Sequence, residues 1–163
     1  MQNLWAPWRM EFIDGVRESR GICVFCEAAL PGDDKKNLVL HRGERAFVLM
    51  NRYPYNNGHL MILPYKHTGV LSDLSSEDYV EILHLSALSM NVMTKQLGPD
   101  GFNCGFNFGR AAGAGITDHL HFHVVPRWSG DTNFMPVLAE TRSMPEHLSA
   151  TYDKLVGHFK DLS

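Results

Sequence analysis

A chain of 163 residues with 44% hydrophobic and 20% charged residues has the size and composition of one globular domain with a substantial core. Its formal net charge of −3 gives no electrostatic basis for binding nucleic acid. Residues 2–9 lack the basic and apolar regions of a signal peptide, and residues 82–94, the longest nearly apolar stretch, are too short to span a bilayer, so we expect a cytoplasmic protein without a membrane partner.

The first candidate site follows an N-terminal arm over residues 1–20. Cys23 and Cys26 have the spacing of half a tetrahedral zinc site. With Cys104 the chain has three cysteines, and an odd count argues against a disulfide framework. The other zinc ligands would be histidines or carboxylates, because no second Cys-x-x-Cys exists. Two unlinked thiols or a redox pair are the alternatives.

Apolar runs and turn residues predict the secondary structure. Four segments are expected to be strands: residues 38–40, 46–50, 59–64 and 101–108. The first two form a hairpin. A long helix is expected from Ser76 to Leu97, with a capping box of Ser75 and Asp78 and an end at Gly98. Its expected core stripe consists of Tyr79, Ile82, Leu83, Met90, Met93 and Leu97. A weaker helix is expected over residues 147–159. Strands around one long helix predict an α+β fold with an antiparallel sheet.

Three histidines alternate with apolar residues from His119 through His121 to His123. A period of two is that of a β-strand, so we expect the imidazoles on one face, about 7 Å apart, and the intervening apolar residues in the core. Buried imidazoles need hydrogen-bond partners or a metal, so the pattern points to a metal site or a catalytic imidazole. A row of surface histidines on an edge strand is the alternative.

A glycine-rich segment, Gly109 to Gly115, precedes the histidines. Glycines permit positive φ, and consecutive backbone N–H groups could form a nest for a phosphate. The nearby histidines support the interpretation of this segment as a phosphate site, because an imidazole is a competent nucleophile toward phosphorus.

The run from His119 to Val125 resembles the signature of the histidine triad (HIT) superfamily, His-φ-His-φ-His-φ-φ with φ apolar. Residues 48–59 are similar to the family's ribose-contacting segment, and residues 103–115 to its phosphate loop. Residues 126–135 resemble the corresponding segment of a bacterial branch related to diadenosine tetraphosphate hydrolases and phosphorylases. The resemblance implies a HIT-like antiparallel five-stranded sheet with one long helix, paired as a homodimer. It also implies a single HIT domain over residues 1–163, with a C-terminal extension at residues 136–163.

The resemblance also implies residue roles. His121 matches the nucleophile that attacks the α-phosphorus, and His123 and His59 match histidines beside the same phosphate. The implied substrate-binding residues are Asn51 for the ribose, and Asn107, Gly113, Ala114, Gly115 and Ile116 for the phosphates. In members that carry Cys-x-x-Cys, the first triad histidine and a Pro-x-x-His histidine complete a structural zinc site. The set here would be Cys23, Cys26, His67 and His119, although His119 could instead support only the nucleophile.

The implied function is cleavage of dinucleoside polyphosphates or related nucleotide phosphoanhydrides through a nucleotidyl-histidine, with Mg²⁺ entering, if at all, on the substrate. Phosphorolysis of diadenosine tetraphosphate, phosphoramidate hydrolysis and non-catalytic nucleotide binding are alternatives, as is a metallohydrolase whose three triad histidines hold zinc.

Two departures from the family pattern bear on this choice. Ala114, Gly115 and Ile116 stand where many members carry Gly-Gln-Ser, so backbone N–H groups must contact the phosphate instead. The triad ends in His123 rather than glutamine, which favours a hydrolase, although some phosphorylases retain this histidine.

Overall fold

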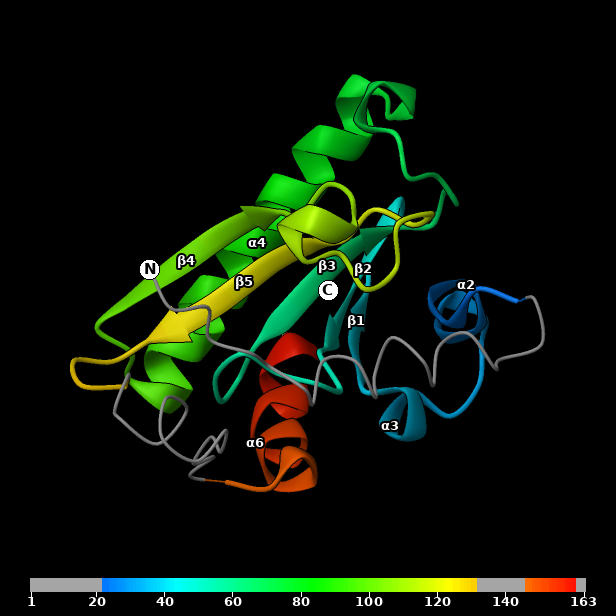
Figure 1. Cartoon of the computed structure of the whole chain (residues 1–163). Helices are drawn as coiled ribbons and strands as arrows, with labels where there is room; N and C mark the ends of the chain where they lie inside the picture. The colour runs from blue at the N-terminus through cyan, green and yellow to red at the C-terminus, as the bar shows by residue number, and fades with distance from the viewer. Residues whose placement is uncertain (1–21, 132–145, 161–163) are drawn as a thin grey trace, which may run out of the picture.

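The computed structural model describes residues 22–131 and 146–160, so the expectations for the N-terminal arm, and those for residues 132–145, lie outside the described residues. The elements in chain order are α2 (Val24–Ala29), α3 (Asp34–Asn37), β1 (Val39–Arg42), β2 (Ala46–Met50), β3 (Leu60–Pro64), η1 (Leu71–Asp73), α4 (Ser76–Leu97), β4 (Gly101–Phe106), η2 (Arg110–Ala112), β5 (Phe122–Arg127) and α6 (Leu148–Lys160) (Figure 1). No helix in these two ranges is long and apolar enough to cross a membrane.

The five strands form one sheet in the order β1-β2-β3-β5-β4, and every neighbouring pair is antiparallel. The predicted α+β fold is therefore confirmed. The expected hairpin is present, but its first strand continues to Arg42, because His41 and Arg42 pair with Val48 and Phe47. Among the described strands, β4 pairs with β5 alone and forms an edge of the sheet.

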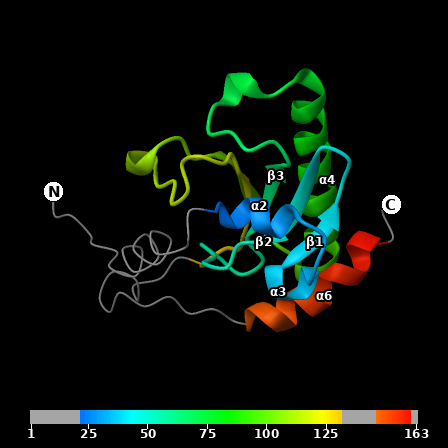
Figure 2. The ribbon, with the colours of Figure 1, turned by 90° about the vertical axis from the view of Figure 1, so that its right-hand side faces the viewer.

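Both faces of the sheet are covered. Alternate residues of β2 and β3 join the core under α4 and α6: Val48, Met50, Leu60 and Ile62. Their neighbours join a second cluster that includes residues of α2: Phe47, Leu49, Met61 and Leu63. Figure 2 shows α2 in front of β1 and β2, with α4 and α6 behind them. Strands buried on both sides explain why β2 and β3 read as continuous apolar runs rather than alternating ones.

The long helix α4 has the predicted bounds. Ser75 and Asp78 form the reciprocal capping box, and Gly98 ends the helix in the left-handed region at φ 60°. The predicted core stripe was wrong at Leu83, which is 60% exposed. Leu83 lies about 100° around the helix from the buried Ile82, outside the face that packs on the sheet.

The C-terminal helix α6 belongs to the main core. Tyr152, Leu155 and Phe159 are at most 4% exposed, and they join the cluster that α4 forms with the sheet. The Tyr152 hydroxyl donates to the Val39 carbonyl at 2.9 Å, which ties α6 to β1.

The short helices α2 and α3 were not predicted. They have six and four residues, too few for an apolar stripe to repeat, and such helices are not stable alone. The N-cap of α3, Asp33, accepts from the Lys36 N–H at 3.0 Å.

Candidate functional site

The alternation of the histidine run is confirmed. Leu120 and Val124 enter the core under α4, while His119, His121 and His123 lie buried on the other face at 1%, 7% and 6% exposure. The prediction of one straight strand was wrong, because β5 begins only at Phe122. The first two histidines precede it, and the run divides its imidazoles between two clusters.

His121 has its proton placed by the backbone. Its Nδ1 lies 2.9 Å from the carbonyl oxygen of His119. A carbonyl can only accept, so Nδ1 carries the proton and Nε2 of the neutral ring carries the lone pair. Burial lowers the pKa of His121, although this hydrogen bond opposes the shift. The ring is therefore neutral near pH 7 and presents Nε2 as a nucleophile.

His59 and His123 form a second hydrogen-bonded pair. The Tyr55 N–H donates to His59 Nδ1 at 3.0 Å, so the proton of His59 is on Nε2. His59 Nε2 then donates to His123 Nδ1 at 2.9 Å, which leaves the proton of His123 on Nε2. The rings of His123 and His121 lie 4.8 Å apart. Burial, and then positive charge on His123 or His121, holds the pKa of His59 well below its ordinary value, so the His59 ring is neutral near pH 7.

One predicted substrate residue, Asn51, contacts this pair, and another, Asn107, contacts Tyr55 beside it. Asn51 accepts from the Tyr53 N–H at 2.9 Å, which turns its amide nitrogen toward His59 Nδ1 at 3.3 Å. Asn107 donates to the Tyr55 hydroxyl at 3.3 Å. The Tyr55 ring packs on His59 at 4.7 Å between ring centroids. Tyr55 was not predicted as a site residue, because its contact with His59 depends on how the loop before β3 folds.

The predicted phosphate loop folds tightly on itself. The N–H groups of Ala112 and Ala114 donate to the Gly109 carbonyl, and that of Gly113 donates to the Arg110 carbonyl. Gly113 has φ 91°, a conformation that favours glycine. Ala114 is buried, and Ile116 packs against the apolar cluster on the histidine face. The end of the loop thus lies on the histidine face of the sheet. Several of the N–H groups that were expected to bind a phosphate donate instead to carbonyls within the loop.

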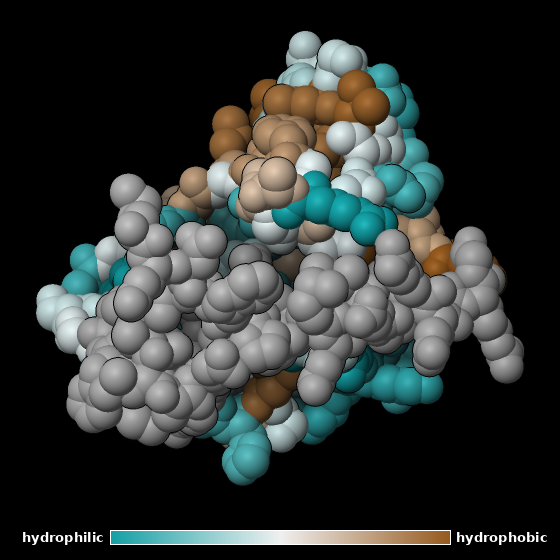
Figure 3. Space-filling model, viewed as in Figure 1, coloured by the Kyte–Doolittle hydropathy of each residue, from teal (hydrophilic) through white to brown (hydrophobic). Residues whose placement is uncertain are grey.

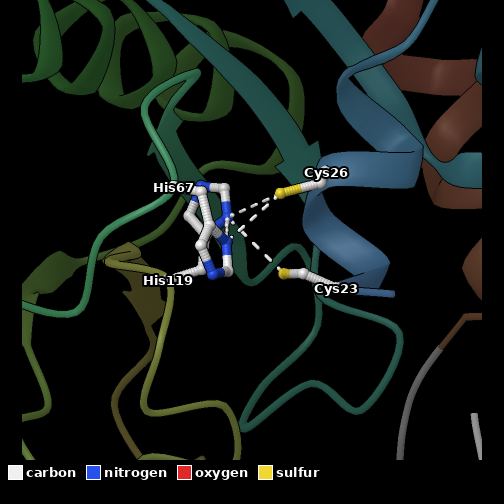
Figure 4. A group of neighbouring side chains, drawn as sticks. All are labelled: Cys23, Cys26, His67 and His119. Carbon is white, nitrogen blue, oxygen red and sulfur yellow. Dashed lines mark hydrogen bonds between the residues drawn. The ribbon is translucent and has the colours of Figure 1, made fainter. Parts of the chain in front are cut away.

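The predicted metal ligands meet although they lie far apart in the chain. Cys23, Cys26, His67 and His119 offer ligand atoms that all lie within 4.8 Å of one another (Figure 4). The His67 and His119 Nδ1 atoms are 3.3 Å apart. Sulfur–nitrogen distances are 3.3 Å from Cys26 to His67 and 3.5 Å from either cysteine to His119.

These distances fit a tetrahedral zinc ion. Bonds of about 2.05 Å to nitrogen and 2.3 Å to sulfur give edges of about 3.3 Å between nitrogens and about 3.6 Å between nitrogen and sulfur. His119 Nε2 donates to the Pro64 carbonyl at 2.9 Å, so its Nδ1 lone pair faces the cluster. Burial, and then the neighbouring Cys23, raises the pKa of Cys26, so two thiolates need a compensating cation here.

Comparison with known proteins places this geometry in a family. Residues 33–130 match the family model described as HIT domain. The chain is 35% identical over 157 residues to an AP-4-A phosphorylase of Mycobacterium tuberculosis, covering 93% of this chain and 80% of that protein. It is 30% identical over 105 residues to the adenosine 5'-monophosphoramidase hnt1 of Schizosaccharomyces pombe, covering 64% and 74%.

Solved structures agree with the sequence comparison. A zinc-bound histidine triad family protein from Mycobacterium smegmatis superposes with a TM-score of 0.66 at 26% identity, covering 86% of this chain and 94% of that one. A histidine triad nucleotide-binding protein from Sulfolobus tokodaii has a TM-score of 0.63 at 23% identity, covering 85% and 90%, and supports the fold alone.

Proposed function

We propose a nucleotidyl-transfer activity for this chain, which belongs to the histidine triad (HIT) family. The substrate would be a dinucleoside polyphosphate, and the intermediate a nucleotide joined covalently to His121. The observation that carries this proposal is the hydrogen bond from His121 Nδ1 to the His119 carbonyl, because it leaves the lone pair on Nε2 of a buried neutral ring.

The reaction has two displacement steps. In the first, the lone pair of His121 Nε2 attacks the α-phosphorus, an Nε2–P bond forms, and the P–O bond to the rest of the polyphosphate breaks. In the second, an acceptor oxygen attacks the same phosphorus and the Nε2–P bond breaks. Diadenosine tetraphosphate gives ATP in the first step. The second step gives AMP with water or ADP with phosphate.

The neighbouring residues would stabilise the charge at phosphorus. His123 carries its proton on Nε2 and is therefore a donor for a non-bridging oxygen, and His59 fixes this tautomer. Asn51 has a second amide hydrogen for a ribose hydroxyl. Asn107 and the loop from Gly113 to Ile116 would bind the phosphates. Mg²⁺, where required, would arrive with the substrate, since the cluster of metal-ligating side chains in residues 22–131 and 146–160 is the Cys₂His₂ set.

We propose phosphate as the acceptor, on the strength of the similarity to a protein named AP-4-A phosphorylase. The similarity to an adenosine 5'-monophosphoramidase favours hydrolysis as the second candidate. Product analysis on diadenosine tetraphosphate, with and without inorganic phosphate, separates them. ADP and ATP that form only with phosphate support phosphorolysis, AMP and ATP in both cases support hydrolysis, and no turnover supports a non-catalytic nucleotide-binding module.

The Cys₂His₂ cluster would hold a structural zinc ion. Four protein ligands fill the tetrahedron and leave no position for substrate. The alternative of a zinc hydrolase with three triad histidines does not fit, because His119 faces the cysteines while the Nδ1 of His121 faces a carbonyl. Paired thiolates are maintained in a reducing compartment, which supports the proposed cytoplasmic location.

We propose a homodimer that forms at the open edge of β4. Asn103 and Cys104 in the middle of this strand are exposed, and edge strands readily pair with a second chain. The helix α4 also exposes Val80 and Leu83, at 67% and 60%. Figure 3 shows apolar surface at the upper end of the molecule, where this helix lies. Light scattering should report twice the chain mass of 18.4 kDa, and a Cys104→Arg variant should shift it toward a single chain.

A further inference from the structure

The helix α2 contains Cys26 and has Cys23 as its N-cap, and a residue of another element stabilises its C-terminal end. It has six residues and its N-cap, Cys23, makes no side-chain cap. At its other end the guanidinium of Arg42, in β1, donates to three carbonyls at 2.7–3.1 Å: those of Ala28, Ala29 and Leu30. Asp34 accepts from the same guanidinium at 2.7 Å. A cation that satisfies orphan carbonyls stabilises a helix C-terminus, so Arg42 fixes α2 against the sheet.

Phe25 points from this helix into the histidine face. It stands between the cysteines in sequence and is 8% exposed. Its ring centroid lies 5.6 Å from that of His119, at an interplanar angle of 82°, and 5.3 Å from that of His121, at 50°. One phenyl ring therefore contacts both a proposed metal ligand and the proposed nucleophile.

His121 needs such a contact. Its hydrogen bond to the His119 carbonyl fixes Nδ1, but the ring can still tilt about that atom and carry Nε2 away from the phosphorus. The ring of His123 lies at 4.8 Å and 79°, and Phe25 is a second aromatic contact. Misplacing a reacting atom by about 1 Å can slow a reaction about a hundredfold.

We infer that Phe25 is a positioning residue for His121, and that through it the Cys₂His₂ cluster sets the orientation of the reactive imidazole. Arg42 holds α2 at the depth that this contact requires. The inference rests on the proposed function for its kinetic consequence and on the proposed metal site for its coupling. The contact itself depends on neither.

The kinetic test compares two buried phenylalanines of the same apolar cluster. Phe47 is 0% exposed and packs on Tyr65 with 5.3 Å between ring centroids. It is therefore a control for lost packing. We expect Phe25→Leu to slow labelling of His121 by a nucleotide about tenfold with little change in KM, while zinc content stays at wild type. Phe47→Leu should lower Tm without that loss. Equal kcat for wild type and Phe25→Leu, or equal losses in both variants, would overturn the role.

A spectroscopic test keeps the inference independent of turnover. In ¹H–¹³C spectra, Phe25→Leu should shift the ring protons of His121 and His119 through loss of the phenyl ring current, and leave those of His59 in place. Removing zinc with a chelator should shift the His121 signals of wild type, and shift them less in Phe25→Leu. Unmoved His121 signals in Phe25→Leu would overturn the contact, and equal chelator shifts in both proteins would overturn the coupling. If the chain binds nucleotide without turnover, the proposed function is refuted. The chemical shifts of His121 still test whether Phe25 positions its ring.

Discussion

The Cys₂His₂ cluster and the cluster of His59, His121 and His123 both use imidazole rings, but they present opposite ring nitrogens. His119 offers Nδ1 to the metal ligands because its Nε2–H donates to the Pro64 carbonyl. His121, two residues later, offers Nε2 because its Nδ1–H donates to the His119 carbonyl. In both cases the acceptor is a backbone carbonyl. Backbone carbonyls, rather than residue type, thus set which ring nitrogen is left for the proposed metal ligand and which for the proposed nucleophile.

Replacing the nucleophile should have the largest effect on turnover. Without Nε2 at residue 121, the covalent intermediate cannot form, so His121→Ala should lower kcat by at least about a thousandfold while nucleotide binding persists. Acid-labile labelling of the protein with radioactive nucleotide should succeed in wild type and fail in the variant. Turnover near the wild-type rate would remove His121 from the mechanism and erase the distinction between the two clusters.

Removing a ligand of the proposed zinc site should lower thermal stability more than it lowers activity. Cys23→Ser removes one of four ligands, and zinc binding to a closed site contributes directly to folding. We expect about one zinc per wild-type chain, and a loss of at least about 3 kcal/mol in the variant, roughly 10 °C in Tm. Elemental analysis and calorimetry measure both.

Cys104→Ser serves as the control for zinc content, since Cys104 lies on β4, outside the cluster, while Tm is compared with wild type because β4 is also the proposed dimer edge. Wild-type protein that contains no zinc, or a Cys23→Ser variant that keeps its zinc, would contradict the structural role.

Asn51 should separate ribose binding from phosphate binding. Asn51→Ala should weaken the binding of AMP about tenfold, which corresponds to the loss of one hydrogen bond, and leave the affinity for pyrophosphate unchanged. The variant also loses the amide contact to His59, so a smaller fall in kcat is expected. Calorimetric titration with both ligands tests this. Parallel weakening of AMP and pyrophosphate would mean that Asn51 acts only through His59.

The smallest effect should be a pH dependence of stability from His59. Its pKa is far below the ordinary value, owing first to burial and then to His123 and His121, while the Tyr55 N–H occupies its Nδ1. The unfolded chain therefore binds a proton below about pH 6.5 that the folded chain does not, so this stability is present above pH 6.5 and is lost as pH falls. The loss is at most about 1.4 kcal/mol per pH unit.

Comparing wild type with His59→Gln at pH 7.5 and 5.5 isolates this proton, because acid release of zinc affects both proteins. The stability advantage of wild type should shrink at pH 5.5. An advantage that is constant across the range would show that His59 is not buried in its neutral form.

The sequence predicted those features that depend on local pattern. The helix α4 follows from the capping box at Ser75, the apolar repeat and Gly98. The sheet follows from short apolar runs between turns. The four candidate metal ligands follow from the spacing of Cys23 and Cys26 together with a family resemblance, and the structure brings all four together.

Other features depend on backbone paths that no local pattern reveals. The protonated nitrogens of His119 and His121 are decided by where two carbonyls lie. The last carbonyls of α2 are satisfied by Arg42, which comes from another element. The place of Tyr55 against His59 depends on how the loop before β3 turns. In each case the deciding contact joins atoms whose approach is set by tertiary structure.

The bond from Tyr152 to Val39 spans 113 residues and has a consequence for synthesis on the ribosome. The strand β1 emerges early, but the α6 side chains that cover it are translated more than a hundred residues later. Until then, the nascent sheet exposes apolar surface that is buried in the finished molecule. Nascent chains stalled before residue 148 should therefore bind chaperones more strongly than chains with α6 outside the exit tunnel.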